Sequence, residues 1–456
     1  MTSLVPTPSR TGAIGDILAV GFGTTTIMWT VGYLTHMPGV AVPGPVVLGL
    51  MVLCLLAGGY VAGRYMHRAW RGGIYVGLLS SVLNLLMFGS LLTAGQSYEL
   101  KAAARYWVPG FLLVGALLGF LGGLLGCWRT RHSPIYRTIS WKSVLAWVAV
   151  WATRLLIVFG GLVTGFRAGM AVPDWPTSFE FNMFLLPLSK MTGGTFYEHA
   201  HRLMGSLVGL TTMVLAFYLV FADRRTWIKV YGLVALLAVS SQGLLGGLRV
   251  LRETHDAELR AGTMAPTFIN SLLTKVQSLS GLDLAVIHGV AGQTILALLV
   301  GLAVATARAW EHGPEVQLHS GASSDRALTR ALLLLILVQL WLGAMLRHYN
   351  SMIIVHISMA VVVAMVALAV GVRAWGIHIQ IRRLSQGGVW LMFLVVLQIV
   401  IGMVALLVRD YEAKERSALH SYTTTLHQAN GAAILLVTTY LAFWTTRLLK
   451  QPSSRT

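Results

Sequence analysis

Long apolar segments alternate with short polar segments along almost the whole chain. Twelve apolar runs reach or approach the ~20 residues that cross a bilayer as a helix. A lone segment in lipid has to satisfy its own backbone hydrogen bonds, so helices are the structure we expect. The pattern therefore predicts an all-α integral membrane protein with about 12 transmembrane helices. The expected spans lie near residues 17–35, 45–63, 73–94, 108–127, 143–166, 198–221, 229–250, 283–306, 329–347, 353–372, 386–408 and 424–446.

Composition supports a membrane protein and argues against a nucleic-acid-binding one. Of the 456 residues, 56% are hydrophobic and only 11% are charged, whereas a soluble chain carries about 25% charged residues. The net charge of +18 comes from basic residues that lie between the apolar runs. No long basic face is available to hold a phosphate backbone. We therefore expect a lipid bilayer, and no nucleic acid, around this protein.

The basic residues also predict how the chain is oriented in the membrane. Loops in which positive charge dominates, such as the one with Arg224 and Arg225, alternate with loops that mix both signs, such as 249–260. Positively charged loops stay in the cytoplasm. This rule predicts that both termini are cytoplasmic.

The eight spans from residue 143 onward form two similar four-helix units. Each unit has a histidine near the start of two spans and a Gln-x-x-x-Gly sequence in the span before the second histidine. The separation from the first histidine to the glutamine is 41 residues in one unit and 42 in the other. The matching residues are His201, Gln242, Gly246 and His288 in the first unit, and His356, Gln398, Gly402 and His427 in the second, where Gln339 and Gly343 repeat the pattern once more.

This repeat predicts the domain organisation. We expect two pseudo-symmetric four-helix bundles at 143–308 and 329–456, joined by a polar cytoplasmic linker at 309–328. Ligands often bind within such repeated bundles. Residues 1–142 form a separate four-helix membrane region to which the sequence assigns no role.

The four repeated histidines are candidate haem ligands. Each opens a span that runs from outside to inside, so all four side chains are expected at a similar depth toward the outer face. An ionisable residue inside a span is costly and indicates function, and imidazole is a standard axial ligand of haem iron. A single histidine at a helix end is more often an interfacial polar residue, but four equivalent ones favour ligation. Zinc is disfavoured, because neither cysteines nor an HExxH pattern accompany them.

Several other polar residues have competing interpretations. Glu198 lies three residues before His201 and hence on the same helical face. It is either an acid, base or cation stabiliser beside a haem, or simply a favourable acid in a first helical turn. Arg154 lies near the middle of a span and either faces a carboxylate or propionate, or snorkels. We expect His255 to be solvated, and the sequence places His348 and His420 in outer loops.

These motifs resemble those of the haem A synthase family. The resemblance covers roughly residues 143–448, and its Glu-x-x-His-Arg motif within a duplicated four-helix unit is specific. The segments that carry it are 160–165 (GGLVTG), 169–176 (GMAVPDWP), 197–205 (YEHAHRLMG), 242–247 (QGLLGG), 288–289 (HG), 346–348 (LRH) and 426–431 (LHQANG).

The resemblance implies an oxidoreductase. Members of this family convert haem O to haem A, by oxidising the C8 methyl of the porphyrin to a formyl group, for haem-copper terminal oxidases. By this resemblance His201 and His288 would bind the substrate haem, and His356 and His427 would bind the iron of a haem b cofactor. Glu198 would be the family's essential carboxylate.

The resemblance also implies surroundings and partners. It suggests a bacterial inner membrane, with the haem sites toward the outer face, a haem O synthase that hands over the substrate, an electron-transfer partner and terminal oxidase assembly factors. Arg202, Arg249 and Arg347 lie near the outer face and are candidate contacts for haem propionates through charge-assisted hydrogen bonds.

Two further functions fit the same histidines. One is a membrane cytochrome b that carries electrons from quinol, and the other is a non-enzymatic haem carrier or assembly factor. The chain also departs from the family pattern in two respects. Some members have a cysteine pair in an outer loop of the first half, which this chain lacks, and the four spans within 1–142 lie outside the resemblance.

Overall fold

The computed structural model describes residues 12–92, 101–128, 139–261, 279–313, 316–409 and 417–452. Within these ranges, 12 helices are long and apolar enough to cross a membrane. The predicted all-α membrane class and the number of spans are therefore confirmed. Residues 1–11, 262–278 and 453–456 lie outside the described residues.

The long helices follow one another with few other elements between them. Those up to the middle of the chain are α1 (Gly12–Thr35), α2 (Gly44–Tyr65), α3 (Trp70–Leu92), α4 (Ala104–Trp128), α5 (Trp141–Gly165), α6 (Gly193–Ala222) and α7 (Thr226–Ala261). The rest are α9 (Gly281–Ala305), α11 (Ala322–Tyr349), α12 (Ile353–Val372), α13 (Arg382–Leu407) and α14 (Ala418–Leu448). The short elements are η2 (Met183–Leu185), η3 (Leu188–Lys190), α10 (Arg308–Glu311), β1 (Gln317–Leu318), the π-helical turn η4 (Arg373–Ile377) and β2 (Leu449–Lys450).

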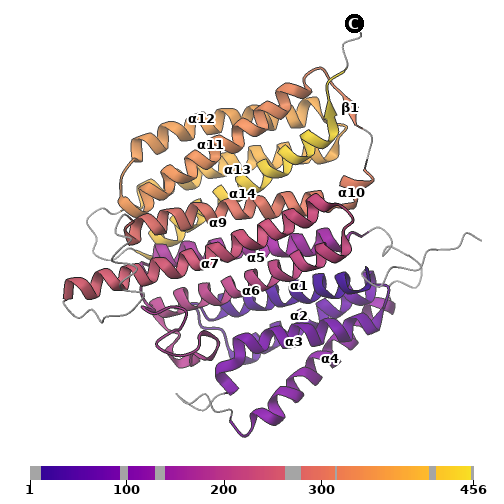
Figure 1. Ribbon diagram of the computed structural model, residues 1–456, viewed down its shortest axis with the longest axis vertical. Coiled ribbons are helices and arrows are strands. Elements are labelled where there is room, and N and C mark those ends of the chain that lie inside the picture. The colour runs from indigo at the N-terminus through magenta and orange to yellow at the C-terminus, as the bar shows by residue number, and fades with distance from the viewer. Residues whose placement is uncertain are drawn as a thin grey trace, which may run out of the picture. The chain divides into compact units, whose positions relative to one another are not determined.

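The chain folds into two compact units. The first contains 1–155, 176–236 and 306–308, and the second contains 156–175, 237–305 and 309–456. The first unit therefore includes α1–α4 and α6, and the second includes α9 and α11–α14 (Figure 1).

Glycines allow three helices of the first unit to pack at very close range. The backbone carbonyl of Gly119 in α4 lies against both Gly59 in α2 and Gly73 in α3, where a Cβ atom would collide with it. Gly63 meets Gly123 in the same way. In lipid, helices associate through van der Waals packing rather than through a hydrophobic driving force, so close backbone approach stabilises such a bundle.

Helix α6, which carries Glu198 and His201, packs against α1 in the first unit. At one end Gly15 of α1 lies against the ring of Tyr218. At the other end the ring centres of Tyr33 and Phe196 are 5.1 Å apart. The N-terminal region thus supports both ends of this helix.

An ion cluster fixes the far end of α6. Asp223, directly after the helix, accepts hydrogen bonds from Lys142 Nζ at 2.6 Å and from Arg225 Nη2 at 2.8 Å. Burial raises the pKa of Asp223, but the hydrogen bonds from Arg225 and Lys142 outweigh burial and hold the pKa below its usual range. The side chain of Asp223 is 1% exposed, so this cluster anchors the start of α5 to the end of α6.

In the second unit, a two-stranded parallel pair joins the segment before α11 to the C-terminal end. Gln317 pairs with Leu449, and Leu318 pairs with Lys450. The backbone N–H of His319 donates to the Lys450 carbonyl at 2.9 Å. The segment 309–328, which we expected to be a linker, therefore contains α10, β1 and the start of α11, and it is docked by hydrogen bonds.

The structure corrects the expected surroundings of three histidines. His255 is not solvated but 2% exposed, because α7 continues to Ala261 through a polar segment that Arg252 and Asp256 stabilise as an i,i+4 ion pair. His348 lies in the last turn of α11 rather than in a loop, where a basic group suits the helix dipole. His420 lies in the first turn of α14, which Ser417 caps.

Candidate functional site

Two of the predicted haem ligands face each other within the second unit. His356 near the start of α12 and His427 of α14 have ring centres 6.3 Å apart, with their planes at 66°. Two imidazoles on opposite sides of one iron ion have ring centres about 6 Å apart, because each metal–nitrogen bond is ~2 Å long and each ring centre lies ~1 Å beyond its nitrogen. Both side chains are half-buried. The spacing of this pair therefore fits axial ligation of a haem.

A glutamine on the preceding helix supports each of these histidines. The amide nitrogen of Gln339 in α11 donates to the backbone carbonyl of His356 at 3.0 Å, and that of Gln398 in α13 donates to the carbonyl of His427 at 3.1 Å. The Gln398 nitrogen also lies 3.2 Å from Nδ1 and 3.1 Å from Nε2 of the His427 ring. The Gln398 nitrogen is nearly equidistant from both ring nitrogens. It therefore packs beside the imidazole ring and does not lie along the lone-pair direction of either nitrogen.

A glycine one turn after each glutamine makes room for the ring. A Cβ atom on Gly343 would lie 3.2 Å from Cε1 of His356, and one on Gly402 would lie 2.9 Å from Cε1 of His427. The Gln-x-x-x-Gly sequence therefore forms a cradle for the histidine of the next helix. We use the term amide cradle for this arrangement of a glutamine, a glycine and a histidine.

The same cradle surrounds a third histidine, on α9. Gln242 of α7 donates to the His288 carbonyl at 2.6 Å and lies 3.0 Å from its Nδ1. A Cβ atom on Gly246 would lie 2.9 Å from His288 Cε1. At the corresponding place in the sequence of α5, Leu156 precedes Gly160, so no amide is available there.

The fourth predicted ligand, His201, belongs to the first unit, whereas His288 belongs to the second. Of the two predicted pairs, the structure brings His356 and His427 together within one unit.

Glu198 is ion-paired and buried in the first unit. Its Oε1 accepts from Arg202 Nη2 at 2.7 Å, and the two side chains are only 5% and 9% exposed. The Nη1 of Arg202 donates to the Thr177 carbonyl at 3.0 Å. Arg202 thus fixes the carboxylate of Glu198 one turn away and ties the loop before α6 to the same helix.

His199 is a neighbour that the sequence did not indicate as functional. Its Nδ1 lies 3.2 Å from the hydroxyl oxygen of Ser178, and its side chain is 2% exposed. Together with Thr177, Ser178 places the loop residues 176–192 against α6. His199 therefore positions the loop rather than facing the same side as His201.

The two other candidate propionate contacts are held by protein groups of the second unit. Arg249 donates to the Gly169 carbonyl at 2.6 Å and pairs with Glu253 at 2.7 Å. Arg347 donates to the Gly161 carbonyl at 2.6 Å and to the Gln428 amide oxygen.

Arg154, the arginine in the middle of a span, faces an aromatic ring. Its guanidinium carbon lies 5.3 Å from the centre of the Trp151 ring. This cation–π contact lies within the first unit and provides a neighbour that the sequence did not suggest.

The comparisons with known proteins add no family assignment. No family model and no curated protein sequence matches this chain. The resemblance to haem A synthases therefore rests on the motifs quoted above and on nothing else.

Proposed function

We propose that this protein is a haem A synthase, which oxidises the C8 methyl of haem O to a formyl group. The observation that carries the proposal is the pairing of His356 and His427, whose ring centres are 6.3 Å apart on two membrane helices. A second feature also supports it, because the carboxylate of Glu198 lies three residues before His201 on α6. Glu198, His201 and His427 lie in segments that carry the resemblance to the family.

The second unit would hold haem b through His356 and His427. When bound, haem b supplies one-electron transfer. Gln339 and Gln398 hold the two histidine backbones, and Asn430 orients Gln398 by donating to its amide oxygen at 2.7 Å. Such outer partners of ligands set the position and basicity of the imidazoles.

The first half of the repeat, residues 143–308, would bind the substrate. His201 and His288 would be the ligands of haem O, whose apolar farnesyl tail lets it enter from the lipid. Arg202, Arg249 and Arg347 would reach its propionates, or those of haem b, from the outer side of the membrane. A haem O synthase would supply the substrate, and a separate redox partner would take up the electrons.

Glu198 would stabilise positive charge that develops as the ring methyl is oxidised. Its ion pair with Arg202 at 2.7 Å holds an ionised carboxylate in a buried position. A preorganised charge in a water-poor site is worth more than the same charge in water. This arrangement favours charge stabilisation over proton transfer for Glu198.

The test is a product analysis of the full-length protein in a host that supplies haem O. Haems extracted from the wild type, from Glu198→Gln and from the control Glu311→Gln would be separated by chromatography and identified by mass. Glu311 lies in the short helix α10, outside the proposed site, so its loss should leave the product unchanged. The wild type and the control should yield haem A, and Glu198→Gln should accumulate haem O or a hydroxylated haem.

Other outcomes would replace the proposal. If the wild type contains haem b but makes no haem A, a quinol-linked cytochrome b becomes the better assignment, and a quinol oxidation assay would test it. If Glu198→Gln makes as much haem A as the wild type, the carboxylate has no part in the reaction.

A further inference from the structure

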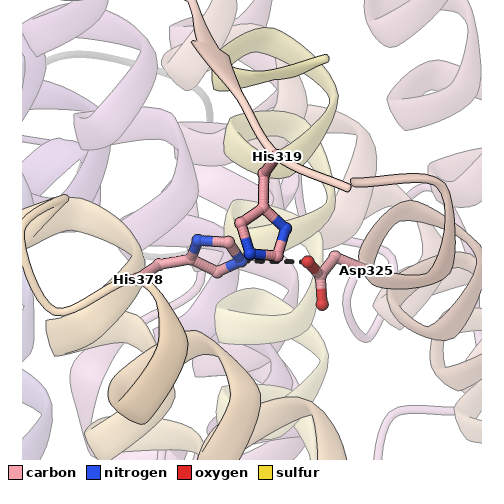
Figure 2. A group of neighbouring side chains, drawn as sticks. All are labelled: His319, Asp325 and His378. Carbon is pink, nitrogen blue, oxygen red and sulfur yellow. Dashed lines mark hydrogen bonds and ion pairs between the residues drawn. The ribbon is translucent and has the colours of Figure 1, made fainter. Parts of the chain in front are cut away.

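A second group of histidines lies in the second unit, away from the amide cradles. His319 follows β1, Asp325 lies in the first turn of α11, and His378 directly follows η4 (Figure 2). One ligand atom from each of the three residues lies within 4.8 Å of the others. Figure 2 shows the three side chains converging from separate segments of the chain.

The distances within this group suit a small metal ion. His378 Nε2 and Asp325 Oδ2 are 2.9 Å apart. The ring centres of His319 and His378 are 5.0 Å apart. Two imidazoles bound to one tetrahedral ion have ring centres about 5 Å apart, since each centre lies ~3 Å from the metal. This spacing is shorter than that of His356 and His427, as expected for a tetrahedral rather than a linear N–metal–N angle.

The carboxylate already has the outer partner that a metal ligand needs. Arg373 Nε donates to Asp325 Oδ1 at 2.7 Å, which leaves Oδ2 directed at the histidines. Ligating carboxylates are usually hydrogen-bonded in this way through their other oxygen. Asp325 and His378 are each 5% exposed, and a cavity of about 10 Å³ adjoins them and Arg373. His319 does not line this cavity, which is large enough for about one water molecule.

We propose that His319, Asp325 and His378 bind a divalent transition-metal ion of the zinc class. Two imidazoles and one carboxylate are a common donor set for zinc, with a water molecule in the fourth position. Both histidines would bind as neutral rings that keep their proton on the other nitrogen. Nδ1 of His319 accepts a hydrogen bond from the Gly321 N–H at 3.0 Å. If Nε2 binds the metal, Nδ1 carries the proton and can no longer accept, so this hydrogen bond is replaced by the bond to the metal.

The bound ion would fasten the segment between the two bundles to the turn between α12 and α13. His319 directly follows β1, Asp325 lies in α11, and His378 directly follows η4. This role is independent of the proposed haem chemistry, because none of the three residues belongs to an amide cradle.

The test is zinc binding by the full-length protein in detergent. Metal removed with a chelator would be replaced by titration with Zn²⁺ against a chromophoric competitor, and bound metal would be counted by elemental analysis. The variants are His319→Ala and His378→Asn. The matched control is His312→Ala, since His312 lies in the same segment and its side chain is 72% exposed.

The wild type and His312→Ala should bind one zinc ion with similar affinity, whereas both site variants should lose at least tenfold in affinity and keep the haem content of the wild type. Co²⁺ in place of Zn²⁺ should give visible d–d absorption in the wild type and in His312→Ala, but not in His319→Ala or His378→Asn. Absence of zinc binding in the wild type, or full binding by His319→Ala, would overturn the proposal. A variant that lost haem as well would be judged unfolded, and the wild-type cobalt spectrum would then decide the question.

Discussion

Two histidine pairs in the second unit differ in ways that predict different ligands. His356 and His427 have ring centres 6.3 Å apart and amide cradles around them, whereas His319 and His378 are 5.0 Å apart and share Asp325. The wider pair fits ligands on opposite sides of an iron ion, and the narrower pair fits ligands at a tetrahedral angle. The two proposed sites therefore differ in ring spacing and in the presence of a carboxylate, and not in the residue type that would bind the metal.

Removing one histidine from each pair should have the largest effect on bound haem and bound zinc. His427→Ala should lose most of the bound haem b, because one axial ligand is removed, and it should keep zinc binding. His378→Ala should lose zinc and keep the haem absorbance. Visible spectra and elemental analysis of the same preparations measure both quantities. If either variant lost both haem and zinc while it remained folded, the two sites would not be separate.

Removing one cradle amide should have the next largest effect. Gln398→Leu keeps the volume but loses the hydrogen bond to the His427 carbonyl, and loss of an outer partner typically costs about 10- to 100-fold in affinity. Haem titration and the midpoint potential measure the change. Gln386→Leu on the same helix is the control, because Gln386 is exposed. If Gln398→Leu and Gln386→Leu bound haem equally well, the amide cradle would have no role in haem binding.

Filling the space beside the ring should have a moderate and graded effect. Gly402→Ala places a Cβ atom 2.9 Å from the His427 ring, whereas Gly343→Ala leaves 3.2 Å to the His356 ring. Overpacking of this kind costs about 1–3 kcal/mol, with Gly402→Ala the worse of the two. Thermal unfolding and haem spectra follow the effect. Gly376→Ala, which meets nothing within 4 Å, should be neutral, and a reversed order would contradict the geometry.

Weakening the outer partner of Asp325 should have the smallest effect. Arg373→Gln removes the charge next to the carboxylate, but the Arg373 side chain is 32% exposed. A partly exposed ion pair contributes about 0–1 kcal/mol, so zinc affinity should fall no more than about fivefold. Competition titration measures this change, and a total loss of zinc would mean that Arg373 holds the whole cluster in place.

The sequence predicted most of the fold because lipid leaves the backbone few alternatives. Twelve apolar runs were enough to place the spans, since each run has to form a helix in a bilayer. The end of α7 was missed because residues 251–261 are polar, and only ion pairs between neighbouring turns indicate that the helix continues.

The candidate sites were predicted less completely. Repetition of histidines and of Gln-x-x-x-Gly pointed to the cradles, but not to the contact of each glutamine with the next histidine. The ion pair of Glu198 with Arg202 was accessible from their i,i+4 spacing. The cluster of His319, Asp325 and His378 was not, because it joins residues 53 positions apart in sequence through the folding of a segment that looked like a linker.

The pairing of β1 with β2 has a consequence for biosynthesis. His319 is held through the carbonyl of Lys450, which lies after α14 and hence four long helices further along the chain. Chains emerge from the ribosome N-terminus first, so the segment around His319 waits, after its own insertion, for α11 to α14 to be completed. The region between the two bundles is therefore among the last parts of the second unit to mature, and a chain that terminates early cannot close it.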